Sequence, residues 1–151
     1  MNMYRKFFFM IATSTVIMFG LMYLNTNELD HVFFSETRAY MALIMGATMA
    51  AIMLVFMLGM YKDQTINTLI FIGSALVFGV SLWLARSQTT IEDVSWMRAM
   101  IPHHSIAILT SERANITDPR VRKLADGIIA AQRKEIGEMK ALIKDLNANA
   151  K

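Results

Sequence analysis

The sequence predicts an all-α membrane protein, in which three transmembrane helices precede a C-terminal helical hairpin. Of its 151 residues, 55% are hydrophobic and only 18% are charged, whereas a soluble domain usually has about 25% charged residues. The apolar residues are concentrated before Arg86, and the remainder has the composition of ordinary soluble helices. We therefore expect a transmembrane domain at residues 1–86 and a hairpin domain at residues 87–151.

Three uncharged apolar runs occupy residues 7–24, 39–61 and 65–85. Each is about 18 to 23 residues long, which is enough for a helix to cross a hydrocarbon core of roughly 30 Å. The first run follows Arg5 and Lys6, as the apolar region of a signal peptide would. It is long for a signal peptide and lacks a small-residue cleavage site, so we interpret it as an uncleaved anchor.

Charged residues in the short loops predict the orientation of the helices. Arg5, Lys6 and Lys62 fall on one side, whereas acidic residues accumulate in the loop between the first two runs. Basic residues mark the cytoplasmic side, which places the N-terminus in the cytoplasm of the cell. Three spans then place the hairpin outside, which in a bacterium is the periplasmic side of the inner membrane. His31, beside Asp30 in the outer loop, is expected to be solvated, with a role as an accessory ligand as the alternative.

The hairpin domain opens at a polar break, residues 87–90, where threonines precede acidic residues by three positions, as in a helix cap. Helices are expected at residues 91–114 and 119–147. Asp118 and Pro119 mark the start of the second helix, because a carboxylate caps a helix and proline suits its first position. Two helices enclose little core, so we expect the hairpin to complete a bundle as a homo-oligomer.

One flank of the first hairpin helix combines residues that bind metals. Pro102 removes the hydrogen bond to the carbonyl of Arg98 and should kink the helix just before two histidines. At about 100° per residue, a carboxylate, two thioethers and an imidazole share this flank, with a second imidazole close by. These residues are Asp93, Met97, Met100, His104 and His103.

On the second hairpin helix, a carboxylate interrupts the predicted core strip, and an amide precedes it on the same side. The strip is Leu124, Ile128, Glu135, Met139, Leu142 and Leu146, and the amide is Gln132. A carboxylate at a core position is costly unless it is paired or ligated.

Thioethers and imidazoles together favour the soft cations Cu(I) and Ag(I), whereas zinc rarely uses methionine and hard cations prefer oxygen ligands. The chain has no cysteine, which leaves methionine and histidine as its soft ligands. The alternative is that the methionines only fill gaps in the core.

The pattern Met97-x-x-Met100-Ile-Pro-His103-His104 is followed by a second one that begins at Asp118-Pro and ends at Gln132-x-x-Glu135-Ile-x-x-Met139. In these features, residues 91–146 resemble the bacterial domain of unknown function 305. That family is similar to ferritin-like helical bundles, and some members are periplasmic copper-binding proteins linked to copper tolerance. The resemblance therefore implies a ferritin-like bundle and copper binding.

The resemblance also implies a set of ligands. Two thioethers and two imidazoles of the first pattern and one thioether of the second would ligate the metal, and the amide and carboxylate would shape or complete the site. These are Met97, Met100, His103, His104 and Met139, with Gln132 and Glu135. One departure is Thr110, which stands where family members often have a further methionine, so a site that needs that thioether would be rearranged.

Methionines recur at every fourth residue of the second apolar run, at Met41, Met45, Met49, Met53 and Met57. A similar spacing in the second of three spans is found in the Ctr-type copper transporters, so a copper-conducting channel is one alternative function. Helix packing or lipid contact is the other interpretation, because a four-residue step winds these side chains round about 160° of the helix.

We expect a membrane-anchored protein that binds Cu(I), with Ag(I) as an alternative cation, for copper tolerance or homeostasis. We identify no source of catalytic turnover, and a ferritin-like oxidoreductase would need more core glutamates and a Glu-x-x-His motif. A structural or assembly subunit that binds no metal is a further alternative. The basic residues form no block that suggests a nucleic-acid partner. The expected partners are the bilayer, the copper ion and further copies of the chain.

Overall fold

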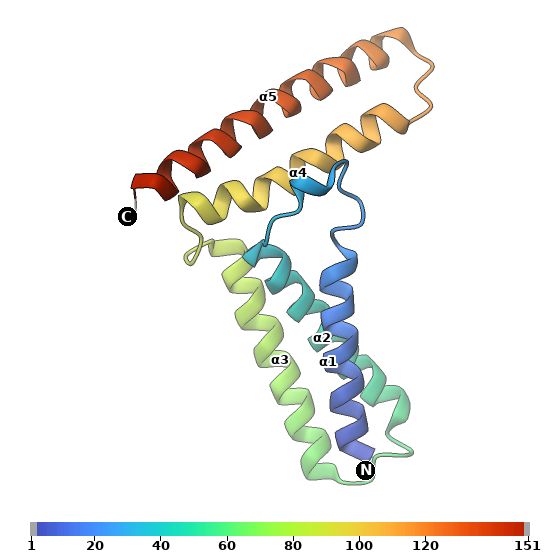
Figure 1. Ribbon diagram of the computed structural model, residues 1–151. Coiled ribbons are helices and arrows are strands. Elements are labelled where there is room, and N and C mark those ends of the chain that lie inside the picture. Colours follow the sequence, from blue (N-terminus) through green and yellow to red (C-terminus); the bar gives the residue numbers. More distant parts are fainter. Residues whose placement is uncertain (1–2, 150–151) are drawn as a thin grey trace. The chain divides into compact units, whose positions relative to one another are not determined.

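The computed structural model describes residues 3–149, and all regular secondary structure in that part of the chain is helical (Figure 1). The predicted all-α fold is therefore confirmed. The elements are α1 (Met3–Leu21), a short 3-10 helix η1 (Leu29–His31), α2 (Glu36–Met57), α3 (Gln64–Ser87), α4 (Asp93–Arg113) and α5 (Pro119–Asn149). They form two compact units, one built from α1, α2 and α3 and the other from η1, α4 and α5.

The hairpin unit includes residues 23–36, which the predicted boundary assigned to the transmembrane domain. This segment, called the strap below, connects α1 to α2 in the sequence. The backbone N–H of Asn27 donates a hydrogen bond of 2.7 Å to Ser105 Oγ on α4, and Phe33 packs against the hairpin core. Such contacts join residues far apart in the chain, so composition and loop position could not reveal them.

Two helices, α2 and α3, are long and apolar enough to cross a membrane, whereas three spans were predicted. Helix α1 has 19 residues and begins at Met3, so every 18-residue stretch of it includes Arg5 and Lys6. It also ends at Leu21 rather than at residue 24. Its uncharged part is therefore about 22 Å long, which is short of a hydrocarbon core of roughly 30 Å.

The three helices of the first unit pack through an apolar cluster and are linked by polar contacts at both ends. The cluster consists of Phe7, Ala50, Leu54, Tyr61 and Ile70. At one end, the Tyr4 hydroxyl donates to Asn67 Oδ1 at 3.0 Å. At the other, an Arg38 N–H donates to the carbonyl of Met22 at 2.6 Å. The first contact joins the starts of α1 and α3, and the second joins the end of α1 to the start of α2. The three helices of this unit therefore alternate in direction.

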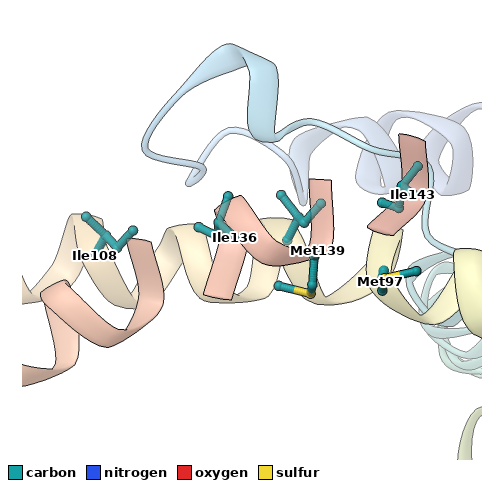
Figure 2. Packing of buried hydrophobic residues seen from close by; sticks show 6 residues of the cluster. Met97, Ile108, Ile136, Met139 and Ile143 are labelled. Atoms are coloured by element: carbon teal, nitrogen blue, oxygen red, sulfur yellow. The ribbon is translucent and has the colours of Figure 1, made fainter. Parts of the chain in front are cut away.

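The α4–α5 hairpin (Figure 1) has a buried core to which both helices contribute (Figure 2). The core residues are Met97, Ile101, Ile108, Ile136, Met139 and Ile143. Helix α5 begins at Pro119 as predicted, with Asp118 Oδ1 accepting from the backbone N–H of Arg120 at 2.8 Å. The predicted threonine cap of α4 is wrong, because Glu92 is the N-cap and makes no side-chain capping hydrogen bond.

Candidate metal site

Helix α4 divides its candidate ligands between the core and the surface. Met97 is buried in the hairpin core, and Met100 packs against that core from its edge. His104 is largely buried, whereas Asp93 and His103 are exposed. The structure therefore supports a grouping of two thioethers and one imidazole on the inner face, and it does not bring Asp93 or His103 into that group.

The predicted core strip of α5 is wrong except at Met139. The buried face instead consists of Ala125, Ile136, Met139 and Ile143. Leu124 and Leu142 are among the exposed apolar residues, and Glu135 is also exposed. The apolar arc of α5 is wider than the surface that α4 and the strap cover, and periodicity alone does not show which part of such an arc is covered.

His104 and Glu135 meet at the edge of the hairpin core. Nδ1 of His104 lies 3.1 Å from Oε2 of Glu135, and the side chains are 14% and 48% exposed, respectively. The Gln132 amide donates to the same carboxylate oxygen at 3.5 Å. Glu135 is thus paired, but at the border of the core rather than within it.

The imidazole of His104 suits a metal ligand. Burial lowers its pKa below the ordinary value of 6.5, the neighbouring Glu135 carboxylate raises it, and His103 lowers it again. The ring is therefore mostly neutral at pH 7, as metal ligation requires. Its Nδ1 is buried, and no group among the described residues is aligned to form a hydrogen bond with it, although Glu135 is close. A buried ring nitrogen without a hydrogen bond is unusual in a folded protein.

The thioethers lie one helical turn from the His104–Glu135 contact. Met100 precedes His104 by four residues on α4, and Met139 follows Glu135 by four residues on α5. Because the two helices are antiparallel, both steps lead along the hairpin in the same direction. Figure 2 shows Met97 and Met139, from facing helices, in one row of the core. The hairpin thus places two thioethers about one helical turn from the His104–Glu135 contact, and Met97 lies about one further turn along α4.

A second group of possible ligands lies in the strap, where Glu28, Asp30 and His31 offer ligand atoms within 4.8 Å of one another. The expectation that His31 is solvated is wrong, because its ring is buried and its Nδ1 lies 2.9 Å from Ser105 Oγ. Lys140 donates to Asp30 at 2.6 Å and so already occupies one carboxylate. This group has no thioether, and no local sequence signal links it to α4.

The methionines of α2 differ in exposure. Met41 is exposed, whereas Met53 and Met57 pack against the apolar cluster of the first unit. Met45 and Met49 are half-buried, as Met53 and Met57 are.

Comparison with known proteins places this hairpin in a family. The family model "Domain of unknown function (DUF305)" matches residues 93–151. Uncharacterized protein L153 of Acanthamoeba polyphaga mimivirus is 31% identical over 146 residues, which are 90% of this chain and 92% of that protein. The protein belongs to the DUF305 family.

The sequence resemblance to this family is thereby confirmed. The similarity to the viral relative extends over both units, so it includes helices α1, α2 and α3 as well as the hairpin. No solved structure matches the chain. Neither the family description nor the name of the relative states a ligand or an activity.

Proposed function

We propose that this protein is a membrane-anchored, extracytoplasmic protein that binds Cu(I) for copper tolerance or homeostasis. The observation that supports this proposal best is the largely buried His104 ring, in contact with Glu135 and one helical turn from Met100 on α4. In the proposed site, His104, Met100 and Met139 ligate the metal. Glu135 and Gln132 orient the imidazole and balance the charge of the cation.

The chemistry of these donors favours Cu(I) over harder cations. Thioether sulfur and neutral imidazole nitrogen are soft ligands, and Cu(I) is the common biological cation that prefers them. The site lies at the edge of an apolar core, where water has little access to Met139. A single carboxylate at the rim, that of Glu135, offsets the positive charge at low cost because it keeps partial contact with solvent.

One observation favours the alternative in which the hairpin is purely structural. Met97 and Met139 pack among four isoleucines in the buried core, as gap-filling methionines do. Under that alternative, replacing methionine by leucine would keep the packing and change no ligand affinity. The two hypotheses therefore differ in the effect of Met→Leu variants on copper binding.

Helices α2 and α3 supply the proposed anchor. Their outward side chains include strongly exposed apolar residues, such as Phe56 and Leu76, which water would not favour but lipid would. We include α1 as a third span because Phe7 packs into the same cluster as α2 and α3. The long side chains of Arg5 and Lys6 can reach the interface from a short span. Three spans would place the hairpin outside the cytoplasm.

The test is a Cu(I) titration of the purified full-length protein in detergent, under reducing conditions and against a competing chelator. We expect His104→Ala and Met100→Leu each to lower the affinity at least about tenfold. Glu135→Gln should lower it by about 10- to 100-fold, as the loss of a group that orients a metal-binding imidazole does. Met41→Leu, at an exposed methionine of α2, is the matched control and should bind as the wild type does. Preference for Zn(II), or unchanged affinity in both ligand variants, would refute the proposal.

A further inference from the structure

The strap contains a cluster of possible metal ligands that the proposed copper site does not use. Glu28, Asp30 and His31 each offer one ligand atom, and these atoms lie within 4.8 Å of one another. His31 is the last residue of η1, which lies against α4 (Figure 1). Two carboxylates alone would indicate only a solvated loop, so the case for a metal site depends on the imidazole beside them.

The His31 ring is held in one orientation by α4. Its side chain is only 6% exposed, and its Nδ1 lies 2.9 Å from Ser105 Oγ. The same Oγ accepts a hydrogen bond of 2.7 Å from the backbone N–H of Asn27, which fixes the hydroxyl in place. A histidine that binds a metal through one ring nitrogen usually has a hydrogen bond at the other. In His31, Nδ1 has this partner, which leaves Nε2 as the nitrogen able to bind a metal.

Nε2 of His31 faces both carboxylates at a distance too long for a hydrogen bond. It lies 3.7 Å from Oε2 of Glu28 and 3.7 Å from Oδ1 of Asp30. A charge-assisted hydrogen bond between imidazole and carboxylate would be about 2.7–2.9 Å long. The largely buried ring is therefore directed at two carboxylate oxygens without bonding to either, which is how ligands of one cation are arranged.

The separations fit the geometry of a small divalent cation. Zinc binds imidazole nitrogen and carboxylate oxygen at about 2.0–2.2 Å, most often in a tetrahedral arrangement. Two ligand atoms of one such ion are then about 3.4 Å apart. The 3.7 Å separations at His31 exceed this value only slightly. Because the Glu28 and Asp30 side chains are 57% and 66% exposed, small rotations of both can bring their oxygens to the ion.

A lysine from α5 orients one of the two carboxylates. Lys140 Nζ donates to Oδ2 of Asp30 at 2.6 Å, whereas Oδ1 is the oxygen that faces His31. The lysine thus holds the outer oxygen and leaves Oδ1 for a metal. Carboxylates that bind metals commonly accept a further hydrogen bond of this kind. Ser105 on α4 and Lys140 on α5 therefore support the cluster from both helices of the hairpin.

We propose that the strap binds one divalent cation of the zinc class through Glu28, Asp30 and Nε2 of His31. One imidazole and two carboxylates favour a cation of intermediate hardness, because Cu(I) prefers thioethers and Ca(II) and Mg(II) prefer oxygen ligands alone. The site is distinct from the candidate copper site in its ligands and in its preferred metal. An ion bound here also stabilises the strap on the hairpin, since α4 and α5 position its ligands.

The test is a Zn(II) titration of the purified full-length protein in detergent, against a competing chelator. Glu28→Gln removes one exposed ligand and leaves the contacts of the strap with Ser105 and Lys140 in place. We expect this variant to lower the affinity for Zn(II) at least about tenfold, because even groups that only orient a metal ligand contribute that much. The matched control is Glu138→Gln, which removes the same charge from an exposed pair with Lys134 and should bind Zn(II) as the wild type does.

Amide hydrogen exchange gives a second readout. The Val32 amide donates to the carbonyl of Leu29, so its protection reports on the opening of η1. At a free Zn(II) concentration of about 100 times Kd, this protection should rise about 100-fold in the wild type, as binding to the folded strap alone requires. At the same concentration the Glu28→Gln variant should show a much smaller rise.

Three outcomes would overturn the inference. Wild-type protein that binds Zn(II) no more tightly than Glu28→Gln would show that His31 is only a paired imidazole. An equal loss of affinity in Glu138→Gln would assign the binding to net charge. Zn(II) binding that is lost in His104→Ala and kept in Glu28→Gln would assign the ion to the candidate copper site. Cu(I) and Zn(II) affinities at the hairpin are compared in the Glu28→Gln variant, so that this inference and the proposed function can fail separately.

Discussion

Replacing Ser105 by alanine should release the strap from the hairpin. The Ser105 side chain is fully buried, and its Oγ contacts both the N–H of Asn27 and the Nδ1 of His31, at 2.7 Å and 2.9 Å. Alanine fits the same space but leaves both groups without a partner. A buried polar group that loses its partner costs about 1–3 kcal/mol. Because Asn27 is only partly buried, we expect a total of about 2–4 kcal/mol.

The assay is amide hydrogen exchange of the strap in the full-length protein. The amides of His31 and Val32 donate within the strap itself, so their protection reports on strap opening and does not depend on Ser105 directly. Since about 1.4 kcal/mol corresponds to a factor of ten, their protection should fall by roughly 30- to 700-fold. The control is Thr110→Ala, because the exposed Thr110 hydroxyl bonds only to carbonyls of its own helix. Equal protection in the two variants would refute the assignment of the strap to the hairpin unit.

Three further predictions follow from the same structure. Gly46→Leu should lower the thermal midpoint of the first unit in detergent, because a side chain at this position collides with Thr15 of α1. An unchanged midpoint would contradict the close packing of α1 against α2 at Gly46. The hydrogen bond from Lys140 holds the pKa of Asp30 below its ordinary 3.8. Lys140→Met should therefore be less stable than the wild type above pH 4, and this difference in stability should vanish as the pH falls through the lowered pKa. A Lys140→Met effect that persists at pH 2 would count against this pair. In an NMR titration the His104 pKa should lie below 6.5. The Glu135→Gln variant should lower this pKa further, because the carboxylate raises it. A higher His104 pKa in Glu135→Gln would contradict the contact between His104 and Glu135.

The sequence was sufficient for features that depend on local signals. The Asp118–Pro119 pair placed the start of α5 correctly, because a capping carboxylate and a helix-opening proline act within one turn. The apolar runs located α2 and α3, since length and composition alone decide whether a helix can span a bilayer. The grouping of Met97, Met100 and His104 on one inner face of α4 also followed from helical periodicity.

Features that depend on long-range packing were missed. The burial of His31 rests on Ser105, which is 74 residues away, so neither residue signals the contact by itself. On α5, the apolar arc includes both the buried face at Ile136 and the exposed side at Leu124, and only the position of α4 distinguishes them. For α1, the sequence indicated an apolar run, but the helix begins early enough to include Arg5 and ends before residue 24.

The strap changes how the hairpin is held to the rest of the chain. A domain attached only through its own N-terminal linker is released when that linker is cut. Here the strap is covalently continuous with α1 and α2, and it contacts the hairpin through Asn27, His31 and Phe33. A protease that cuts the chain between residues 90 and 91 would therefore leave the hairpin bound to the strap, and a second event would be needed to separate it from α1 and α2.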